Sequence, residues 1–320
     1  MQPLLDAIAT MECPTHAQRI FHGRGGLHPG CEHLVLDAFP PALLLTSFSP
    51  LSEEDIACIA AALQARWAQI APATELTWVL QTRDVGGKFL TRLMQGSLPV
   101  PHIVQEGDAR YLVHLERGQN HGLFLDMAAG RSWVARTVAA QPAPERMKVL
   151  NLFAYTCAFS VVAKLAGAGT VTNMDMSKGA LATGQHNHQI NGVKAGASFL
   201  GHDIFTSWGK IGRSGPYHLI VVDPPSYQKG SFVATKDYAR LVRRLPDLLR
   251  PGGQALLCLN APELSTRFLQ DIVQEQAPEL EFVERLANPA VFADVDEERS
   301  LKVLVYRLPE LQATAEKPQD

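Results

Sequence analysis

The 320-residue chain has no apolar run close to the roughly 20 residues that a membrane-spanning helix needs. Its first residues, MQPLLDAIATMECP, carry Asp6 and no Lys or Arg, which is unlike an export signal. We therefore expect a cytoplasmic protein with no membrane partner.

Cysteine is scarce and scattered. No two cysteines are spaced as CxxC, and their number is odd: Cys13, Cys31, Cys58, Cys157 and Cys258. A disulfide framework needs paired cysteines, and a structural zinc site needs closely spaced ligands. The sequence therefore predicts reduced thiols and no bound metal.

Basic charge is not in excess, because the formal net charge is -3. Most nucleic-acid-binding domains are basic, so an RNA partner would have to meet a local basic surface. The glycine pattern GxGxxG is also missing, which argues against a nicotinamide-dependent oxidoreductase.

Short strand-like runs dominate the first half of the chain. We expect strands over 33–36, 42–48 and 76–81, and an amphipathic helix that begins after Ser52 and runs to Gln69. A hairpin of strands 111–115 and 122–125, followed by a strand over 132–138, is expected before the prolines of QPAPER. These patterns predict a smaller, β-rich mixed α/β domain over 1–100 and a hairpin and linker over 101–145.

The second half alternates strands and helices, which predicts an α/β domain with a doubly wound parallel sheet over 146–310. The expected strands are 148–153, 170–175, 198–200, 218–223, 255–259, 281–286 and 301–308, and the expected helices are 158–165, 177–190, 235–249 and 265–276. The polar residues 311–320 are expected to form a flexible tail.

Acidic residues end three of these strands. Asp175 follows Asn151 by 24 residues, close to the spacing of about 20 that suits hydrogen bonding to a ribose, although Asp175 could instead cap the next helix. Asp203 ends the third strand and could accept a hydrogen bond from an adenine amino group. Ligands bind at the carboxyl ends of such strands, so these acids should lie together.

The fourth strand ends in Asp223-Pro-Pro-Ser-Tyr227. Pro224 and Pro225 remove two N–H donors and leave carbonyl oxygens beside a carboxylate and an aromatic ring. Such a site can accept hydrogen bonds from the amino group of a planar base and stack on that base. An ordinary Pro-Pro strand end is the alternative interpretation.

The segments NLFAYT, DMSK, GHDIF and DPPSY together resemble class I S-adenosylmethionine-dependent methyltransferases. They are most similar to the bacterial large-subunit ribosomal RNA methyltransferases that modify cytosine C5 or guanine N7, and the resemblance covers about residues 100–308. It implies a Rossmann-like, seven-stranded methyltransferase sheet, S-adenosyl-L-methionine as cofactor, a nucleobase as acceptor and ribosomal RNA as partner.

The resemblance also implies a set of site residues. Phe124 and Asp126 would close the site from the hairpin side, Asp175 would hold the ribose, and Asp203 the adenine. The implied cofactor-binding residues are Phe124, Asp126, Asn151, Phe153, Tyr155, Thr156, Asp175, Met176, Ser177, Asp203, Ile204 and Asp223, and the implied catalytic residues are Asp223, Pro224, Pro225 and Tyr227. Relatives usually carry glycine where this chain has Cys157 and Ala158.

Several alternatives remain open. Cys258 could be the nucleophile that cytosine C5 methylation needs, but its place in an apolar strand favours a buried structural thiol. Arg240, Arg243 and Arg244 could bind phosphate from one helical face or form a solvated surface. A non-catalytic RNA-binding protein on this fold, or a methyltransferase of a small molecule or protein, are the competing functions.

Overall fold

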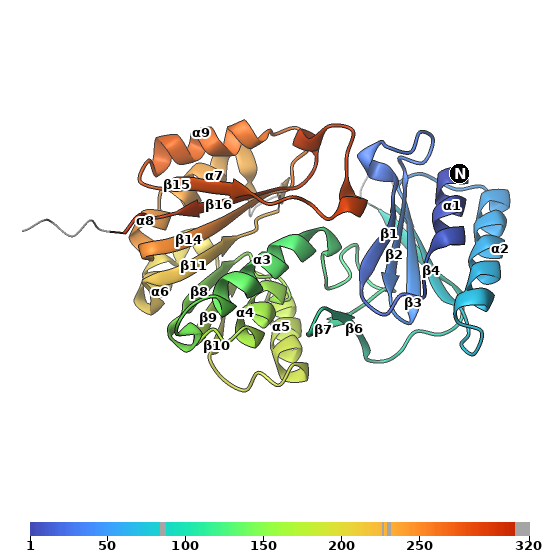
Figure 1. The fold of residues 1–320 in the computed structure, drawn as a ribbon, viewed down its shortest axis with the longest axis horizontal. Helices are drawn as coiled ribbons and strands as arrows, with labels where there is room; N and C mark the ends of the chain where they lie inside the picture. Colours follow the sequence, from blue (N-terminus) through green and yellow to red (C-terminus); the bar gives the residue numbers. More distant parts are fainter. Residues whose placement is uncertain (84–87, 226, 229–231, 311–320) are drawn as a thin grey trace, which may run out of the picture.

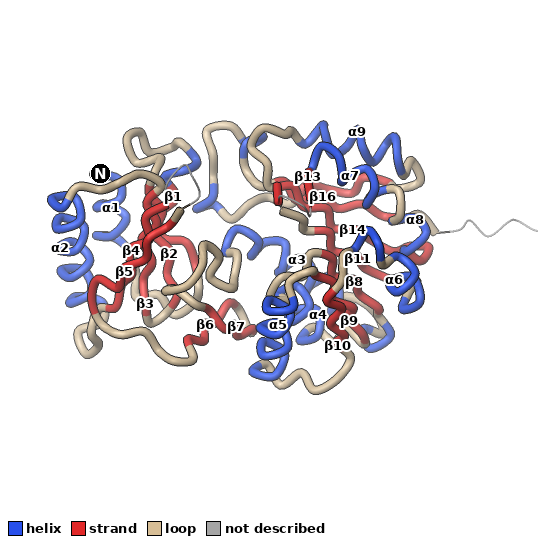
Figure 2. Tube along the Cα trace, turned by 180° about the vertical axis from the view of Figure 1, so that it is seen from behind, coloured by secondary structure: helices blue, strands red, loops and turns tan. Residues whose placement is uncertain are grey.

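The computed structural model describes residues 1–83, 88–225, 227–228 and 232–310, with only the backbone described at 227 and 228. A five-stranded sheet from the N-terminal part stands beside a seven-stranded sheet from the C-terminal part (Figures 1 and 2). The expected tail, 311–320, lies outside the described residues. Within the described part, none of the helices combines the length and the apolar character needed to cross a membrane.

The C-terminal sheet has the order β10-β9-β8-β11-β14-β16-β15. Its strands are β8 (Lys148–Leu152), β9 (Thr170–Asp175), β10 (Ala197–Gly201), β11 (Tyr217–Val222), β14 (Leu249–Leu259), β15 (Glu281–Arg285) and β16 (Lys302–Arg307). The first five are parallel to one another, and β16 is antiparallel to both β14 and β15. The predicted seven-stranded, Rossmann-like sheet is confirmed.

Helices cover both faces of this sheet, as a doubly wound fold requires. They are α3 (Ala128–Ala139), α4 (Ala158–Leu165), α5 (Lys178–Ile190), α6 (Trp208–Ser214), α7 (Ala234–Val242), α8 (Leu245–Leu248) and α9 (Thr266–Gln276). Alternate residues of β11 belong to two separate hydrophobic cores, one on each face of the sheet. Leu219 and Val221 pack with α3 and α4, whereas Ile220 and Val222 pack with α6 to α9. A continuous apolar strand is therefore what β11 needs, because both of its faces are buried.

The N-terminal sheet has the order β1-β2-β3-β4-β5, with α1 and α2 on one face (Figure 1). These elements are α1 (Gln2–Thr10), β1 (Gln18–His22), β2 (Leu34–Phe39), β3 (Ala42–Ser47), α2 (Glu53–Ile70), β4 (Thr77–Arg83) and β5 (Phe89–Gln95). Ser52 is the N-cap of α2, and its hydroxyl accepts the Asp55 N–H at 3.0 Å. The three strands and the helix expected here from the sequence are confirmed with small shifts in their ends.

A two-stranded hairpin fills the junction between the two sheets. β6 (His102–Glu106) pairs with β7 (Ala109–Val113), and Tyr111 of this hairpin is fully buried. Its apolar residues pack with Phe39 and Leu44 of the N-terminal sheet, with Val161 of α4 and with Phe292. The second face of the N-terminal sheet is therefore covered by the hairpin and the C-terminal domain.

The expected hairpin of 111–115 with 122–125 is wrong, and so is the expected strand over 132–138. The strand β7 pairs with β6, which precedes it in the sequence, and not with the segment that follows it. Residues Leu125–Met127 form a single 3-10 turn. Residues 132–138 lie in α3, where Trp133, Val134 and Val138 are buried against β8 and α4. Burial on one helical face outweighs the strand preference of these β-branched and aromatic side chains.

The loop between β8 and α4 adopts a glycine-like backbone without glycine. Phe153, Tyr155 and Cys157 have φ values of 56°, 46° and 63°. Each lies in the left-handed region, which is costly for residues with a side chain. Gly184 of α5 accommodates this loop, because a Cβ at position 184 would lie 2.4 Å from the Cys157 Sγ.

We predict that Gly184→Ala destabilises the protein by about 1–3 kcal/mol, since the added methyl group overpacks against the Cys157 side chain. Combining it with Cys157→Gly should remove most of this loss, because glycine lacks the thiol and tolerates the positive φ. Gly179→Ala in the same helix is the control, since a Cβ there meets nothing within 4 Å. Equal losses in urea melts of the single and double variants would contradict the account.

Candidate active site

A cavity of about 620 Å³ lies at the carboxyl edge of the seven-stranded sheet. This volume falls within the range of small-molecule and cofactor sites. Thirteen of the fifteen predicted site residues line it: Phe124, Asp126, Phe153, Tyr155, Thr156, Asp175, Met176, Ser177, Asp203, Ile204, Asp223, Pro224 and Pro225. The structure thus gathers residues from four strand ends and from the 120–127 segment around one space.

Asp175 links two of the loops that form the cavity. Its Oδ2 accepts the backbone N–H of Tyr155 at 2.8 Å, and its Oδ1 accepts that of Ser177 at 2.7 Å. The side chain that caps α5 is Ser177, whose hydroxyl accepts the Ala180 N–H at 3.2 Å. Because a carboxylate has about four acceptor positions, Asp175 retains capacity for ligand hydroxyl groups.

Asp203 and the residues after it form the far end of the cavity. The Asp203 carboxylate accepts the Phe205 N–H at 2.8 Å, which fixes the turn after β10. Phe205 lines the cavity. The guanidinium of Arg240, a residue of α7, lies 4.0 Å from the centroid of the Phe205 ring. A polar acceptor beside a supported aromatic ring suits a planar heterocycle with an amino group.

The carboxylates of Asp126 and Asp223 both line the cavity. Burial, and then the neighbouring charge of Asp126, raise the pKa of Asp223 to about 7. Burial also raises the pKa of Asp126. Arg131 lies nearby, but its guanidinium forms two 2.6 Å hydrogen bonds with Glu106. The cavity therefore favours a ligand that brings positive charge to these acids.

The structure does not bring Asn151 to the cavity. Its side chain is 1% exposed within β8 and donates to the Asn173 Oδ1 at 2.9 Å. Asn151 therefore links β8 to β9. Because it lies within a central strand, its side chain points toward a packed helix layer and away from the strand ends that form the cavity. The predicted catalytic Tyr227 lies in β12 (Tyr227–Gln228), which pairs with β13 (Phe232–Val233), and its side chain lies outside the described residues.

Several residues that line the cavity were not among the predicted site residues, and Arg131, Asn260 and Leu301 are three of them. Asn260 directly follows β14, just as Asp223 follows β11. The rule that polar residues at parallel strand ends form the site could therefore have found it. Arg131 gives no such signal, since the helix that carries it was expected to be a strand.

Cys258 is fully buried in β14, and it is not among the residues that line the cavity. Burial, and then the neighbouring charge of Asp223, raise the pKa of its thiol well above the ordinary value. A nucleophilic cysteine needs a lowered pKa and access to its substrate. These features favour the structural interpretation of Cys258.

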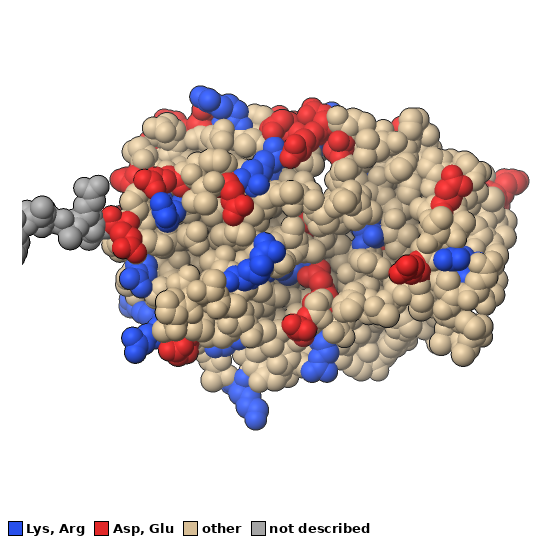
Figure 3. All heavy atoms as spheres, in the orientation of Figure 1, with Lys and Arg blue, Asp and Glu red and all other residues tan. Residues whose placement is uncertain are grey.

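The three arginines considered for phosphate binding lie at and just after the end of α7, which stops at Val242. Arg240 forms an ion pair with Asp237, Arg244 forms one with Asp247, and Arg243 donates to Gln276. Figure 3 shows acidic and basic side chains interspersed over the face that it draws. Each of the three arginines thus has a polar partner within the protein, and both phosphate binding and a solvated surface remain open for them.

We predict that Asp223→Asn stabilises the protein at pH 8 and not at pH 4. The folded-state pKa of about 7 exceeds the ordinary 3.8, so the carboxyl keeps its proton in the folded state between these values. Stability is consequently lost as pH rises through this window, by at most roughly 4 kcal/mol, and the amide avoids that loss. Thermal melts at several pH values test this, with the exposed Asp271→Asn as control. A difference independent of pH would contradict it.

Comparisons with known proteins agree with this geometry. A family model described as S-adenosylmethionine-dependent methyltransferase matches residues 18–307. The Ribosomal RNA large subunit methyltransferase I of Shewanella amazonensis is 30% identical over 236 residues, which cover 70% of this chain and 58% of that protein. The chain thus spans little more than half the length of this curated relative.

Two further likenesses follow. The Ribosomal RNA large subunit methyltransferase K/L of a Psychrobacter species is 35% identical over 160 residues, or 48% of this chain and 19% of that protein. The crystal structure of SMU.776 complexed with SAH has a TM-score of 0.76 at 23% identity, over 96% of this chain and 78% of that one. The family match covers both sheets and the cavity between the strand ends, and the chain belongs to the S-adenosylmethionine-dependent methyltransferase family.

Proposed function

We propose that the protein transfers a methyl group from S-adenosylmethionine to a nucleobase of ribosomal RNA in the cytoplasm. The observation that carries this proposal is the joining of Asp175, Asp203 and Asp223-Pro-Pro in one cavity. The curated relatives support the choice of RNA, since two of them are named as ribosomal RNA methyltransferases.

The cavity residues fit this cofactor. Asp175 and Asp203 lie at the ends of neighbouring parallel strands, so one could bind the ribose and the other the base of a single nucleoside. Asp126 and Asp223 lie in the desolvated centre, where a cationic sulfonium would satisfy their charge. The bound cofactor supplies an already activated methyl group, so the protein's task is alignment and exclusion of water.

The acceptor base would occupy the half of the cavity over β11, β14 and β16. With the nucleoside over β8, β9 and β10, the base could contact the lining residues at the other strand ends, including Pro224, Asn260 and Leu301. The Asp223 carboxylate and the carbonyl oxygens of the two prolines can accept hydrogen bonds from the edge of a base. A base in structured RNA would first have to leave its stack to reach them.

The acceptor atom would be a nitrogen. Methylation of an aromatic carbon such as cytosine C5 requires prior attack by a thiolate. Among the described residues that line the cavity there is no cysteine, and Cys258 is buried with a raised pKa. A nitrogen lone pair attacks the methyl group without such help, so it matches the side chains that are present.

We predict that Asp175→Ala weakens the binding of S-adenosylhomocysteine by at least about 10-fold, because each charge-assisted hydrogen bond contributes roughly 1.5–3 kcal/mol. Isothermal titration calorimetry measures the affinity, and the wild type should show no heat with NAD or NADP. Asp271→Ala on the exposed face of α9 is the matched control. Unchanged affinity in Asp175→Ala would remove the ribose role.

The function itself is tested with ribosomal RNA from a strain that lacks the gene, incubated with enzyme and S-adenosylmethionine carrying a deuterated methyl group. Mass mapping should locate the label on a base nitrogen, and Cys258→Ser should retain activity with no covalent adduct to 5-fluorocytosine RNA. Label on cytosine C5, with an adduct that Cys258→Ser abolishes, would overturn the nitrogen assignment. Absence of any label in RNA would overturn the function.

A further inference from the structure

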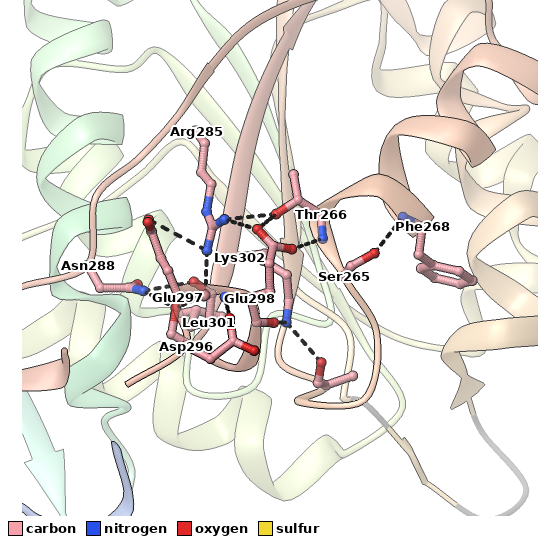
Figure 4. Close-up of polar contacts among 12 residues, drawn as sticks. Ser265, Thr266, Phe268, Arg285, Asn288, Asp296, Glu297, Glu298, Leu301 and Lys302 are labelled. Atoms are coloured by element: carbon pink, nitrogen blue, oxygen red, sulfur yellow. Dashed lines mark hydrogen bonds and ion pairs between the residues drawn. The ribbon is translucent and has the colours of Figure 1, made fainter. Parts of the chain in front are cut away.

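Lys302 is a buried cation close to the cavity. It opens β16, and its side chain is 0% exposed. The ammonium group donates to the backbone carbonyl oxygens of Ala261 at 2.9 Å and of Glu298 at 2.6 Å (Figure 4). Lysine is rarely buried unless its charge is compensated, so these contacts call for an explanation beyond packing.

Glu298 joins this lysine to a second set of contacts. Its carboxylate accepts hydrogen bonds from the backbone N–H and the hydroxyl of Thr266, the latter at 2.9 Å, and from the Arg285 guanidinium (Figure 4). Arg285 also donates to the Glu297 carbonyl oxygen at 2.8 Å. We call Thr266, Arg285, Glu298 and Lys302 the β14–β16 clamp, because they tie the segment after β14 to the segment before β16.

The clamp holds two residues that line the cavity. Ala261 follows Asn260, and Lys302 follows Leu301, so the lysine fixes the backbone beside both. The Leu301 carbonyl oxygen also accepts a hydrogen bond from the Asn288 side chain at 2.9 Å. Asn260 and Leu301 belong to the half of the cavity that lies away from Asp175 and Asp203.

The surroundings favour the charged form of Glu298 and oppose that of Lys302. The backbone N–H of Thr266 holds the pKa of Glu298 below its ordinary value. Burial lowers the pKa of Lys302, while the Glu298 charge acts in the opposite direction. An apolar side chain of similar size would fill the same space at less electrostatic cost, which indicates that geometry is what the charges provide.

We propose that Lys302 and Glu298 are positioning residues that set the acceptor-side wall of the cavity, formed by Asn260 and Leu301, against the incoming base. This inference rests on the proposed function. The clamp would align the acceptor base and would not hold the cofactor, because the cavity residues next to it, Asn260 and Leu301, lie in the acceptor half of the cavity.

The test compares Lys302→Met, Glu298→Gln and Thr266→Val with the wild type in methyl transfer to ribosomal RNA from the deletion strain. We expect kcat to fall by about 10- to 100-fold in Lys302→Met, since misalignment by about an ångström has effects of this size. The RNA KM and the Kd for S-adenosylhomocysteine should each stay within about threefold, because phosphate contacts dominate the affinity for RNA. Glu298→Gln and Thr266→Val should show smaller losses of kcat.

Arg307→Met is the matched control, because Arg307 lies at the other end of β16 in an exposed ion pair with Glu281. It should leave kcat unchanged. Circular dichroism confirms folding at the assay temperature, and if Lys302→Met does not fold, Glu298→Gln and Thr266→Val carry the test. Wild-type kcat in all folded clamp variants, or an equal loss of cofactor affinity, would overturn the inference while leaving RNA methylation in place. RNA that remains unmethylated by the wild type would overturn the proposed function, and the inference with it.

Discussion

The structure depends on carboxylates that are held, largely out of water, at one edge of a parallel sheet. Burial raises the pKa of both Asp126 and Asp223, and the Asp126 charge raises that of Asp223 further. The Arg131 guanidinium, which acts in the opposite direction on both, is hydrogen-bonded to Glu106. Such an arrangement is unfavourable by itself, so the surrounding fold has to maintain it. A positively charged ligand between these carboxylates would compensate their charge, and the relief of this unfavourable burial would add to the free energy of binding.

The N-terminal domain contributes to this site through the 118–122 segment. Gln81 and Arg83 of β4 donate to the carbonyl oxygens of Gly118 and Gln119, and Gln119 lines the cavity. On the other side, the Thr156 hydroxyl donates to the Gly122 carbonyl oxygen at 2.6 Å. The rim of the cavity is thus held from both domains, which explains why a β-rich domain is packed against a cofactor-binding sheet.

Much of this could be predicted from the sequence, because strand alternation and strand-end acids are local patterns. The order of residues around Asp175, Asp203 and Asp223 sufficed to locate the cavity. Features set by tertiary packing could not be predicted: α3 has strand-like residues whose helical burial appears only against β8 and α4. Likewise, Asn151 shares its segment with true cavity residues, and only the register of β8 shows that it points elsewhere.

The most direct test of this account is the proton balance of cofactor binding. Asp223, with a pKa of about 7, is largely protonated at pH 6 before the ligand arrives. Binding of cationic S-adenosylmethionine should expel up to about one proton, measured by calorimetry at pH 6 in buffers of different ionisation enthalpy. The account predicts this release in the wild type and its loss in Asp223→Asn. Binding with no proton release, or with the same release in both proteins, would contradict it.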